Sequence, residues 1–320
     1  MIKPSVWLRI VITLVFIGGL YFIVREELPQ VRGAILGVNP VLLGLTLLLN
    51  LLIVGLVSVR LRLFFDAYGL RFSLMEATSL SFIGLFFNNF LPTSMGGDLA
   101  KAYYAYKKAR RKLASFSSVL ADRLIGLFSM VCMALFGLFF LWKREAASIK
   151  LAVGGLFLLA CLCISILFSR RLARGIQFLV SPLERFGLGG RMKGVYDTLN
   201  ALHEKQFLLW KTLALSLFIH TLAICSVFVL VKGLSLEMPI FHLFLVFPLI
   251  TTVSMLPSLG GLGVREGAFV YFLGDILGKG NAAALSILWF GVIVFLSAIG
   301  GLFYLAQGSV SLKELEEVSS

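Results

Sequence analysis

The sequence is poor in charged residues, which fill 14% of its 320 positions, and it has only three histidines and four scattered cysteines. Soluble globular domains are about 25% charged and about 45–50% apolar, whereas this chain is 59% hydrophobic and contains 29 phenylalanines. Because too few polar residues are present to cover a water-facing surface, a soluble enzyme is excluded. The few histidines and cysteines predict no metal site, no disulfide framework and no cofactor.

The sequence also lacks the motifs of common nucleotide-dependent and hydrolytic enzymes. It contains no Walker A, G-x-S-x-G or H-E-x-x-H pattern, so we expect neither ATP hydrolysis nor a serine or zinc hydrolase. Lysine and arginine outnumber aspartate and glutamate by 29 to 16. In a membrane protein this excess is typical of cytoplasmic loops that face anionic lipid, so we expect no nucleic-acid partner.

Eight apolar segments are separated by short charged connections. We expect an all-α polytopic membrane protein with about six to eight transmembrane helices, in one membrane domain over residues 1–306. Residues 307–320 form a polar tail. The largest connection, 169–207, has apolar residues at helical spacing, which predicts an amphipathic surface helix. The apolar segments are 6–24, 41–59, 74–91, 116–141, 150–168, 208–231, 240–257 and 282–306.

A Pro/Gly motif occurs twice, at matching places in the two parts of the chain. Residues 91–98 read LPTSMGGD, and residues 256–263 read LPSLGGLG. Each motif follows the third apolar segment of its part and precedes a short mixed stretch and a long apolar segment. This pattern predicts two similar halves, 1–145 and 146–306, of the kind found in many transporters.

The distribution of lysine and arginine bears on the topology. Segments 74–91 and 240–257 either cross the membrane completely or enter and leave on one side. The re-entrant alternative agrees better with the positive-inside rule. It leaves three spans per half, so the halves would be inverted and both termini cytoplasmic.

The two motifs predict breaks in helices at membrane depth. A proline lacks the backbone N–H and ends the preceding helix, and glycine adopts conformations closed to other residues. Non-helical backbone in a membrane is tolerated only where it is buried or lines a wet cavity, and a restarting helix directs N–H groups at an anion such as phosphate. Ordinary surface turns are the alternative. The loop positions are Pro92, Gly96, Gly97, Pro257, Gly260, Gly261 and Gly263.

Two charged residues, Asp122 and Arg123, lie inside an otherwise apolar segment. Facing lipid, each would cost about 2.5–3.5 kcal/mol, so we expect them to face the protein interior, water or the headgroup layer. Neighbours on a helix point about 100° apart, which predicts different partners. The planar guanidinium of Arg123 suits a phosphate, and Asp122 is expected to pair with Arg265 or Lys101. A structural ion pair between helices is the alternative.

Further candidate headgroup ligands flank the motifs. Asp98 could cap the restarting helix or bind a ligand. Arg265 and Glu266 could offer one cationic and one anionic contact in a cavity, or form an exposed loop pair. Asn88 and Asn89 could bind a headgroup or satisfy the backbone groups at a helix break.

A basic run precedes the fourth long apolar segment. Such a run orients the chain by the positive-inside rule, and it also attracts anionic lipid at about 1 kcal/mol per residue near the surface. Its members are Lys107, Lys108, Arg110, Arg111 and Lys112.

The sequence resembles the flippase-like membrane domain of the lysylphosphatidylglycerol synthase family. The resemblance rests on LPTSMGGDLAKAYYAYK, SSVLADRLIGL and LPSLGGLGVREGAF, in this order. In bifunctional members the membrane domain is held to move an aminoacylated phospholipid between leaflets, and a separate soluble domain makes that lipid from aminoacyl-tRNA. The chain ends near the point where a soluble synthase domain would begin, so we expect no lysyl transfer.

The resemblance implies a lipid translocase of a bacterial or archaeal plasma membrane. We expect it to bind an anionic phospholipid or polyprenyl-phosphate headgroup in a central polar cavity. Enzymes of lipid or glycan synthesis are its expected partners. The alternatives are a small-solute or ion transporter, an intramembrane enzyme acting on a lipid-phosphate donor, and a non-transporting membrane partner. The functional candidates that the matching motifs imply are Asp98, Asp122, Arg123, Arg265 and Glu266.

Overall fold

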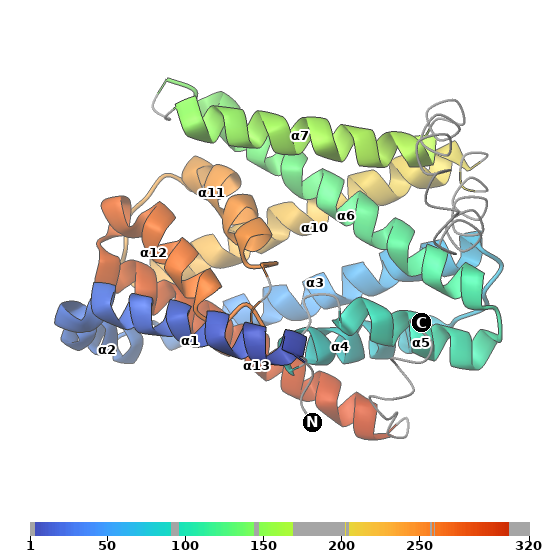
Figure 1. Ribbon diagram of the computed structural model, residues 1–320, viewed down its shortest axis with the longest axis horizontal. Helices are drawn as coiled ribbons and strands as arrows, with labels where there is room; N and C mark the ends of the chain where they lie inside the picture. Colours follow the sequence, from blue (N-terminus) through green and yellow to red (C-terminus); the bar gives the residue numbers. More distant parts are fainter. Residues whose placement is uncertain are drawn as a thin grey trace.

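The computed structural model describes residues 4–90, 96–143, 147–168, 202, 205–256, 258 and 260–306. Over these residues the chain is built from helices and short connections and has no strand (Figure 1). The elements are α1 (Pro4–Val24), η1 (Arg25–Glu27), α2 (Leu28–Leu36), α3 (Pro40–Ala67), α4 (Leu74–Phe90), α5 (Gly96–Ala109), α6 (Lys112–Leu141), α7 (Ala147–Phe168), α10 (Gln206–Gly233), α11 (Ile240–Val253), α12 (Val264–Leu277) and α13 (Lys279–Ala306).

The predicted all-α fold is confirmed, and a helix occupies all or most of each apolar segment. The short mixed stretches after the two motifs are α5 and α12. Helix α2 was not predicted, because it is short and has a mixed composition. The amphipathic helix expected within 169–207 falls almost entirely outside the described residues, and so does the tail 307–320.

Four of the described helices, α3, α6, α10 and α13, are long and apolar enough to cross a membrane. Each has 28 to 30 residues, which corresponds to about 42–45 Å at 1.5 Å per residue, against a hydrocarbon core of about 30 Å. The protein is therefore a multi-pass helical membrane protein.

The shorter helices form two antiparallel hairpins, α4–α5 and α11–α12. Helix α4 has 17 residues and the other three have 14 each, so each is short for a complete crossing. In Figure 1 the α4–α5 hairpin lies toward one end of the long helices and the α11–α12 hairpin toward the other. This arrangement favours the re-entrant alternative for segments 74–91 and 240–257.

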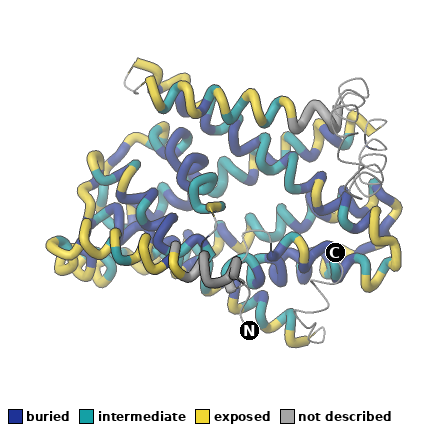
Figure 2. The backbone as a smooth tube through the Cα atoms, in the orientation of Figure 1, coloured by how far each residue is buried: buried dark blue, intermediate teal, exposed yellow. Residues whose placement is uncertain are grey.

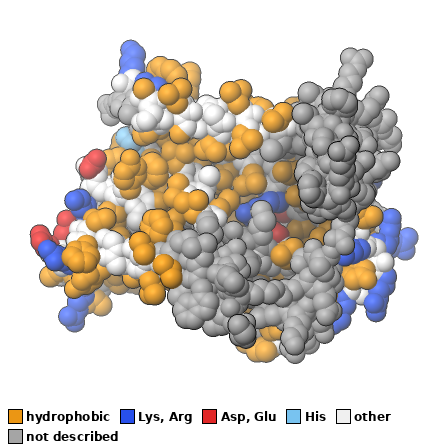
Figure 3. Space-filling model, in the orientation of Figure 1, with side chains coloured by type: hydrophobic (Ala, Val, Ile, Leu, Met, Phe, Trp, Pro, Cys, Tyr) orange, Lys and Arg blue, Asp and Glu red, His pale blue; other side chains and the backbone are white. Residues whose placement is uncertain are grey.

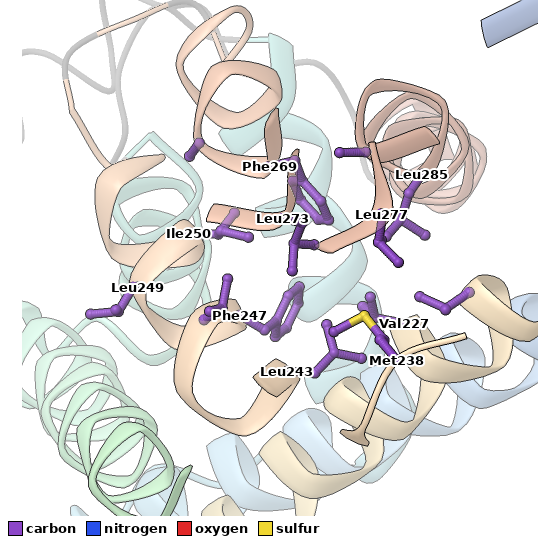
Figure 4. Close-up of a cluster of buried hydrophobic side chains, with 14 of the residues drawn as sticks. Val227, Met238, Leu243, Phe247, Leu249, Ile250, Phe269, Leu273, Leu277 and Leu285 are labelled. Carbon is purple, nitrogen blue, oxygen red and sulfur yellow. The ribbon is translucent and has the colours of Figure 1, made fainter. Parts of the chain in front are cut away.

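The larger hydrophobic core lies around the α11–α12 hairpin, where α10, α11, α12 and α13 meet. Phe269 and Leu273 of α12 are completely buried and point toward Leu243 and Phe247 of α11 (Figure 4). Val227 of α10 closes this cluster on the side of the long helices. The short hairpin is thus held in place by apolar packing on both of its helices.

A second core lies around the α4–α5 hairpin, between α3 and α6, and is rich in aromatic side chains such as Phe64 and Phe65. Buried stretches follow the facing sides of the helices, and exposed stretches follow the outer sides of α1, α2 and α7 (Figure 2). Many exposed side chains are large and apolar, including Leu48 of α3 and Phe139 of α6. Such a surface suits lipid rather than water.

Each hairpin also packs on the long helix that follows the other motif, at a glycine. Helix α4 packs on α13, where a Cβ atom at Gly300 would overlap the carbonyl oxygen of Phe82. Helix α11 packs on α6, where a Cβ atom at Gly137 would overlap the backbone at Phe244 and Leu245. The first helix of each hairpin therefore touches the backbone of a long helix from the other part of the chain.

Candidate functional site

Gly260 of the second motif meets the end of α4. Gly260 has a φ of +58° and lies so close to Asn89 that a Cβ atom would overlap the Asn89 carbonyl oxygen. Gly260, Gly261 and Gly263 all have positive φ values, which explains the glycines of the second motif. Pro92 and Pro257 lie outside the described residues. The described part of the second loop is thus in contact with α4 and is not a separate surface turn.

The two asparagines satisfy broken backbone and neighbouring polar groups. The side-chain oxygen of Asn88 accepts the backbone N–H of Gly97 at 2.8 Å. The amide nitrogen of Asn89 donates to the carbonyl of Leu85 at 2.9 Å and to the hydroxyl of Ser297 at 2.7 Å. Both asparagines therefore hydrogen-bond to groups of the protein itself, which is the second of the two roles considered for them. The amide nitrogen of Asn88 is left as a donor.

Asp122 forms a buried ion pair with Arg60 of α3. Its two carboxylate oxygens accept Nε and Nη2 of Arg60 at 2.6 and 3.1 Å, and Nη1 of Arg60 donates to Ser216 of α10 at 2.6 Å. The side chains of Arg60 and Asp122 are only 8% and 7% exposed. The prediction that Asp122 pairs with Arg265 or Lys101 is therefore wrong. The pair joins α3, α6 and α10, in agreement with the structural alternative.

The sequence pattern did not point to Arg60 because the predicted apolar segment ended at residue 59. In the structure α3 continues to Ala67, so Arg60 lies inside a helix. The apolar residues Leu61, Phe64 and Phe65 that follow it were the available signal, and all three are fully buried. Which acid pairs with Arg60 depends on the packing of α3 against α6, which no local pattern specifies.

Arg123 has a different partner from its neighbour, as predicted. Its Nη1 lies 3.6 Å from a carboxylate oxygen of Asp98, and its Nη2 lies 3.6 Å from the sulfur of Met255. Its Nε is buried and has no hydrogen-bond partner within the described structure. The side chain is 28% exposed. The guanidinium is therefore incompletely satisfied, unlike that of Arg60.

Asp98 is shared between two cations. It lies in the first turn of α5, where a second contact of 3.4 Å joins it to Nζ of Lys101. Charge-assisted hydrogen bonds are normally about 2.7–2.9 Å long, so both contacts of this carboxylate are loose. Asp98, Lys101 and Arg123 form a group with two positive charges and one negative charge, which we call the α5–α6 charge cluster.

The charge cluster borders two cavities, both partly open, which we call the outer cavity where Arg123 lines the wall and the inner cavity where Lys101 does. The outer cavity has a volume of about 230 Å³, and its wall includes Leu99 and Leu120, which are 36% and 39% exposed. The inner cavity has a volume of about 200 Å³ and includes the buried Lys101. The outer cavity is lined by Asp98, Leu99, Ala102, Phe116, Val119, Leu120 and Arg123. The inner cavity is lined by Asn50, Ile53, Val54, Val57, Ser81, Leu85, Asn88, Lys101, Ile293 and Leu296.

Arg265 and Glu266 are both buried and pair with each other at the start of α12. Nη2 of Arg265 lies 2.5 Å from Oε1 of Glu266, and Oε2 of Glu266 accepts the backbone N–H of Gly263 at 2.6 Å. The guanidinium of Arg265 also lies 4.2 Å from the centre of the Phe290 ring. Glu266 thus caps its helix, and neither residue lines the outer or the inner cavity.

The sequence matches the family model described as the Lysylphosphatidylglycerol synthase TM region over residues 6–301. The chain belongs to this family. No curated protein and no solved structure gives a significant match.

The basic run lies at the α5–α6 connection. Lys108 pairs with Glu76 and lies 4.7 Å from the centre of the Phe72 ring. Arg111 donates to the carbonyl oxygens of Tyr68 and Gly69 at 3.3 and 3.4 Å. All five basic side chains are exposed: Lys107, Lys108, Arg110, Arg111 and Lys112.

Glu76 of α4 is the acidic partner of this basic surface. Hydrogen bonds from the Lys108 ammonium and from the backbone N–H of Ser73 hold the pKa of its carboxyl below the ordinary value. Lys108 and Arg111 therefore have structural contacts within the chain. Lys107, Arg110 and Lys112 have no ion pair among the described residues, so they are the members best placed to meet lipid headgroups.

Proposed function

We propose that the protein is a lipid translocase that binds the phosphate of an anionic phospholipid or polyprenyl-phosphate headgroup at Arg123. The observation that carries this proposal is the incomplete bonding of Arg123 inside the membrane helix α6. Its Nε lacks a partner among the described residues, and its contact with Asp98 is 3.6 Å long. A guanidinium presents a fork of donors that matches phosphate oxygens. A phosphate would supply the acceptors that this side chain lacks.

The outer cavity supports a lipid rather than a soluble substrate. Apart from Asp98 and Arg123, all of its lining residues are apolar, and Leu99 and Leu120 reach the exterior of the protein. A headgroup could occupy the polar end while its acyl or prenyl chains stay in the bilayer. Basic and acidic side chains lie together near the middle of the view in Figure 3, with apolar side chains among the described residues around them.

The arrangement of the two hairpins supports movement between leaflets. We propose that 1–145 and 146–306 are inverted halves, because each hairpin packs on a long helix of the other half at Gly300 or Gly137. Gly260 of the second motif also touches Asn89 of α4 in the other half. In this arrangement one hairpin faces each side of the membrane, and rocking of the halves would expose the site alternately.

The same proposal includes the membrane in which the protein works and its orientation there. We place the protein in the plasma membrane with both termini in the cytoplasm, because this orientation puts the exposed basic run on the cytoplasmic side. Enzymes of lipid or glycan synthesis would supply the substrate. The flow of lipid would be downhill or coupled to an ion gradient.

A scrambling assay in proteoliposomes tests the proposal. Purified protein is reconstituted with a fluorescent anionic phospholipid or a polyprenyl-phosphate probe, and the loss of outer-leaflet probe is followed with and without a proton gradient. We expect wild type to move at least one probe. Arg123→Ala removes charge-assisted bonds worth about 1.5–3 kcal/mol, so we expect a rate roughly 10- to 100-fold lower.

Two control variants sharpen this test. Arg62→Ala removes an arginine that is 46% exposed and paired loosely with Asp66, and we expect an unchanged rate. Arg123→Lys keeps the charge but loses the planar fork, and we expect a rate between those of wild type and Arg123→Ala. Absence of lipid movement by folded wild type, or full activity of Arg123→Ala, contradicts the proposal. Flux of a polar solute without lipid movement would instead favour a small-solute transporter.

A further inference from the structure

We infer that the translocated headgroup is a phosphodiester with an uncharged, hydroxyl-bearing substituent, and that a lipid with a cationic substituent is disfavoured. This inference rests on the proposed function and narrows its substrate class. It follows from the charges that line the two cavities and from the way the charge cluster connects them.

The charges lining the cavities sum to one excess positive charge. Arg123 and Asp98 are the charged residues of the outer cavity, and Lys101 is the charged residue of the inner one. A phosphodiester carries one negative charge, so its binding would bring the total to zero. A lipid with a cationic substituent, such as an aminoacyl group, would leave excess positive charge among these residues.

Among the described residues, the two buried acids cannot compensate for a cationic substituent. The carboxylate of Asp122 is held by both Nε and Nη2 of Arg60, and that of Glu266 is held by Arg265 and by the N–H of Gly263. Neither residue lines the outer or the inner cavity. Among the lining residues, Asp98 is the one acid, and two cations already share it.

The charge cluster links the cavities along α5. Asp98 lines the outer cavity, Lys101 lines the inner cavity, and a contact of 3.4 Å joins their side chains. A phosphate that replaces Asp98 beside Arg123 would therefore come close to Lys101. The substituent on that phosphate would extend toward the inner cavity.

Lys101 lines the inner cavity, and its side chain packs closely against α4. Its stem lies across Gly84, where a Cβ atom would overlap Cε of the lysine. Only 11% of the Lys101 side chain is exposed. The absence of a side chain at Gly84 thus makes room for a buried cation, which is costly unless an anion is nearby.

The inner cavity suits a small hydroxylated group. Its volume is about 200 Å³, which is room for a small polar group. The amide nitrogen of Asn50 is engaged by Thr46 and Ser226, which leaves its side-chain oxygen as an acceptor. Asn88 accepts from Gly97 and keeps its amide nitrogen as a donor. Hydroxyl groups can use both kinds of partner.

The test compares headgroups in the same proteoliposomes. The probes are fluorescent phosphatidylglycerol, phosphatidylcholine and lysyl-phosphatidylglycerol, and a polyprenyl phosphodiester that carries a neutral sugar. We expect phosphatidylglycerol or the polyprenyl probe to move at least roughly tenfold faster than the lysyl lipid, because like charges repel strongly at contact distance. The faster of the two anionic probes identifies the lipid source of the phosphodiester.

A variant of Lys101 tests the origin of this selectivity. Lys101→Gln removes the positive charge from the inner cavity and keeps a polar side chain of similar length. We expect the preference for phosphatidylglycerol over the lysyl lipid to fall several-fold, whereas Arg62→Gln, which removes an exposed cation of α3, leaves it unchanged. The wild-type comparison alone tests the inference if Lys101→Gln does not fold.

The outcomes separate the inference from the proposed function. If wild type moves none of the probes, the proposed translocase function fails. If it moves the lysyl lipid as fast as phosphatidylglycerol, the translocase function stands and the inference about the headgroup is overturned. Equal selectivity in wild type and folded Lys101→Gln would show that Lys101 does not set the preference.

Discussion

The buried pair between Arg60 and Asp122 gives a quantitative prediction for stability. Asp122→Ala leaves Arg60 with the hydroxyl of Ser216 as its remaining hydrogen-bond partner among the described residues. Both side chains of the pair are more than nine-tenths buried. Removal of one partner from a buried ion pair costs about 3–5 kcal/mol, because the other charge stays buried without compensation. We expect Asp122→Ala to lower the free energy of unfolding by this amount.

Replacement of both partners should restore most of the loss. An apolar pair of similar volume needs no compensation, and such replacements are often neutral or stabilising in soluble proteins. We therefore expect Arg60→Met/Asp122→Leu to be more stable than Asp122→Ala. The two variants and wild type are compared by unfolding in mixed detergent micelles, with folding followed by circular dichroism.

The exposed pair of Arg62 and Asp66 on the same helix supplies a matched control. Its atoms are 3.7 Å apart and both side chains are about half exposed. Exposed ion pairs contribute about 0–1 kcal/mol, so Asp66→Ala should change stability very little. The reasoning fails if Asp122→Ala unfolds like wild type, or if the double variant is no more stable than Asp122→Ala.

Three further predictions follow from the packing and from the basic surface. Gly300→Ala places a Cβ atom on the carbonyl oxygen of Phe82, so we expect it to destabilise the protein by about 1–3 kcal/mol. Gly291→Ala adds a Cβ atom where there is open space in the same helix, so we expect it not to lower the unfolding midpoint. Phe269→Ala empties a fully buried site and should cost about 3–5 kcal/mol, measured in the same micelles; a loss below about 1 kcal/mol would contradict this packing. The lowered pKa of Glu76 means that its contribution is present above the unfolded pKa of about 4.3 and is lost as the pH falls through the folded value. The melting temperatures of wild type and Glu76→Gln should therefore differ at pH 7 and converge under acid conditions, and a difference that persists in acid would count against this assignment.

The sequence predicted the helices well because their signals are local. Long apolar runs and the two Pro/Gly motifs marked α3, α6, α10 and α13 and the two hairpins. The different partners of Asp122 and Arg123 followed from helix geometry alone. The mixed composition of α2 gave no comparable signal, so that helix was missed.

The pairing of charges was not predictable in the same way. Asp122 pairs with Arg60 because α3 and α6 cross there. The two residues are 62 positions apart, so no local sequence pattern predicts their contact. Arg265 and Glu266, in contrast, are adjacent in sequence and satisfy each other. The sequence showed that these charges needed partners in an apolar environment, but only the tertiary packing determines which charge meets which.

The loose contacts of Asp98 have a consequence for turnover. A transport protein must release its cargo as readily as it captures it, so tight binding alone would trap the substrate. Asp98 is tethered beside Arg123 and Lys101, and it is therefore always present at a high effective concentration. In the proposed translocase it would act as a resident substitute for phosphate that takes the place of each departing headgroup. The same carboxylate that weakens capture would thus speed departure and reset the cations for the next lipid.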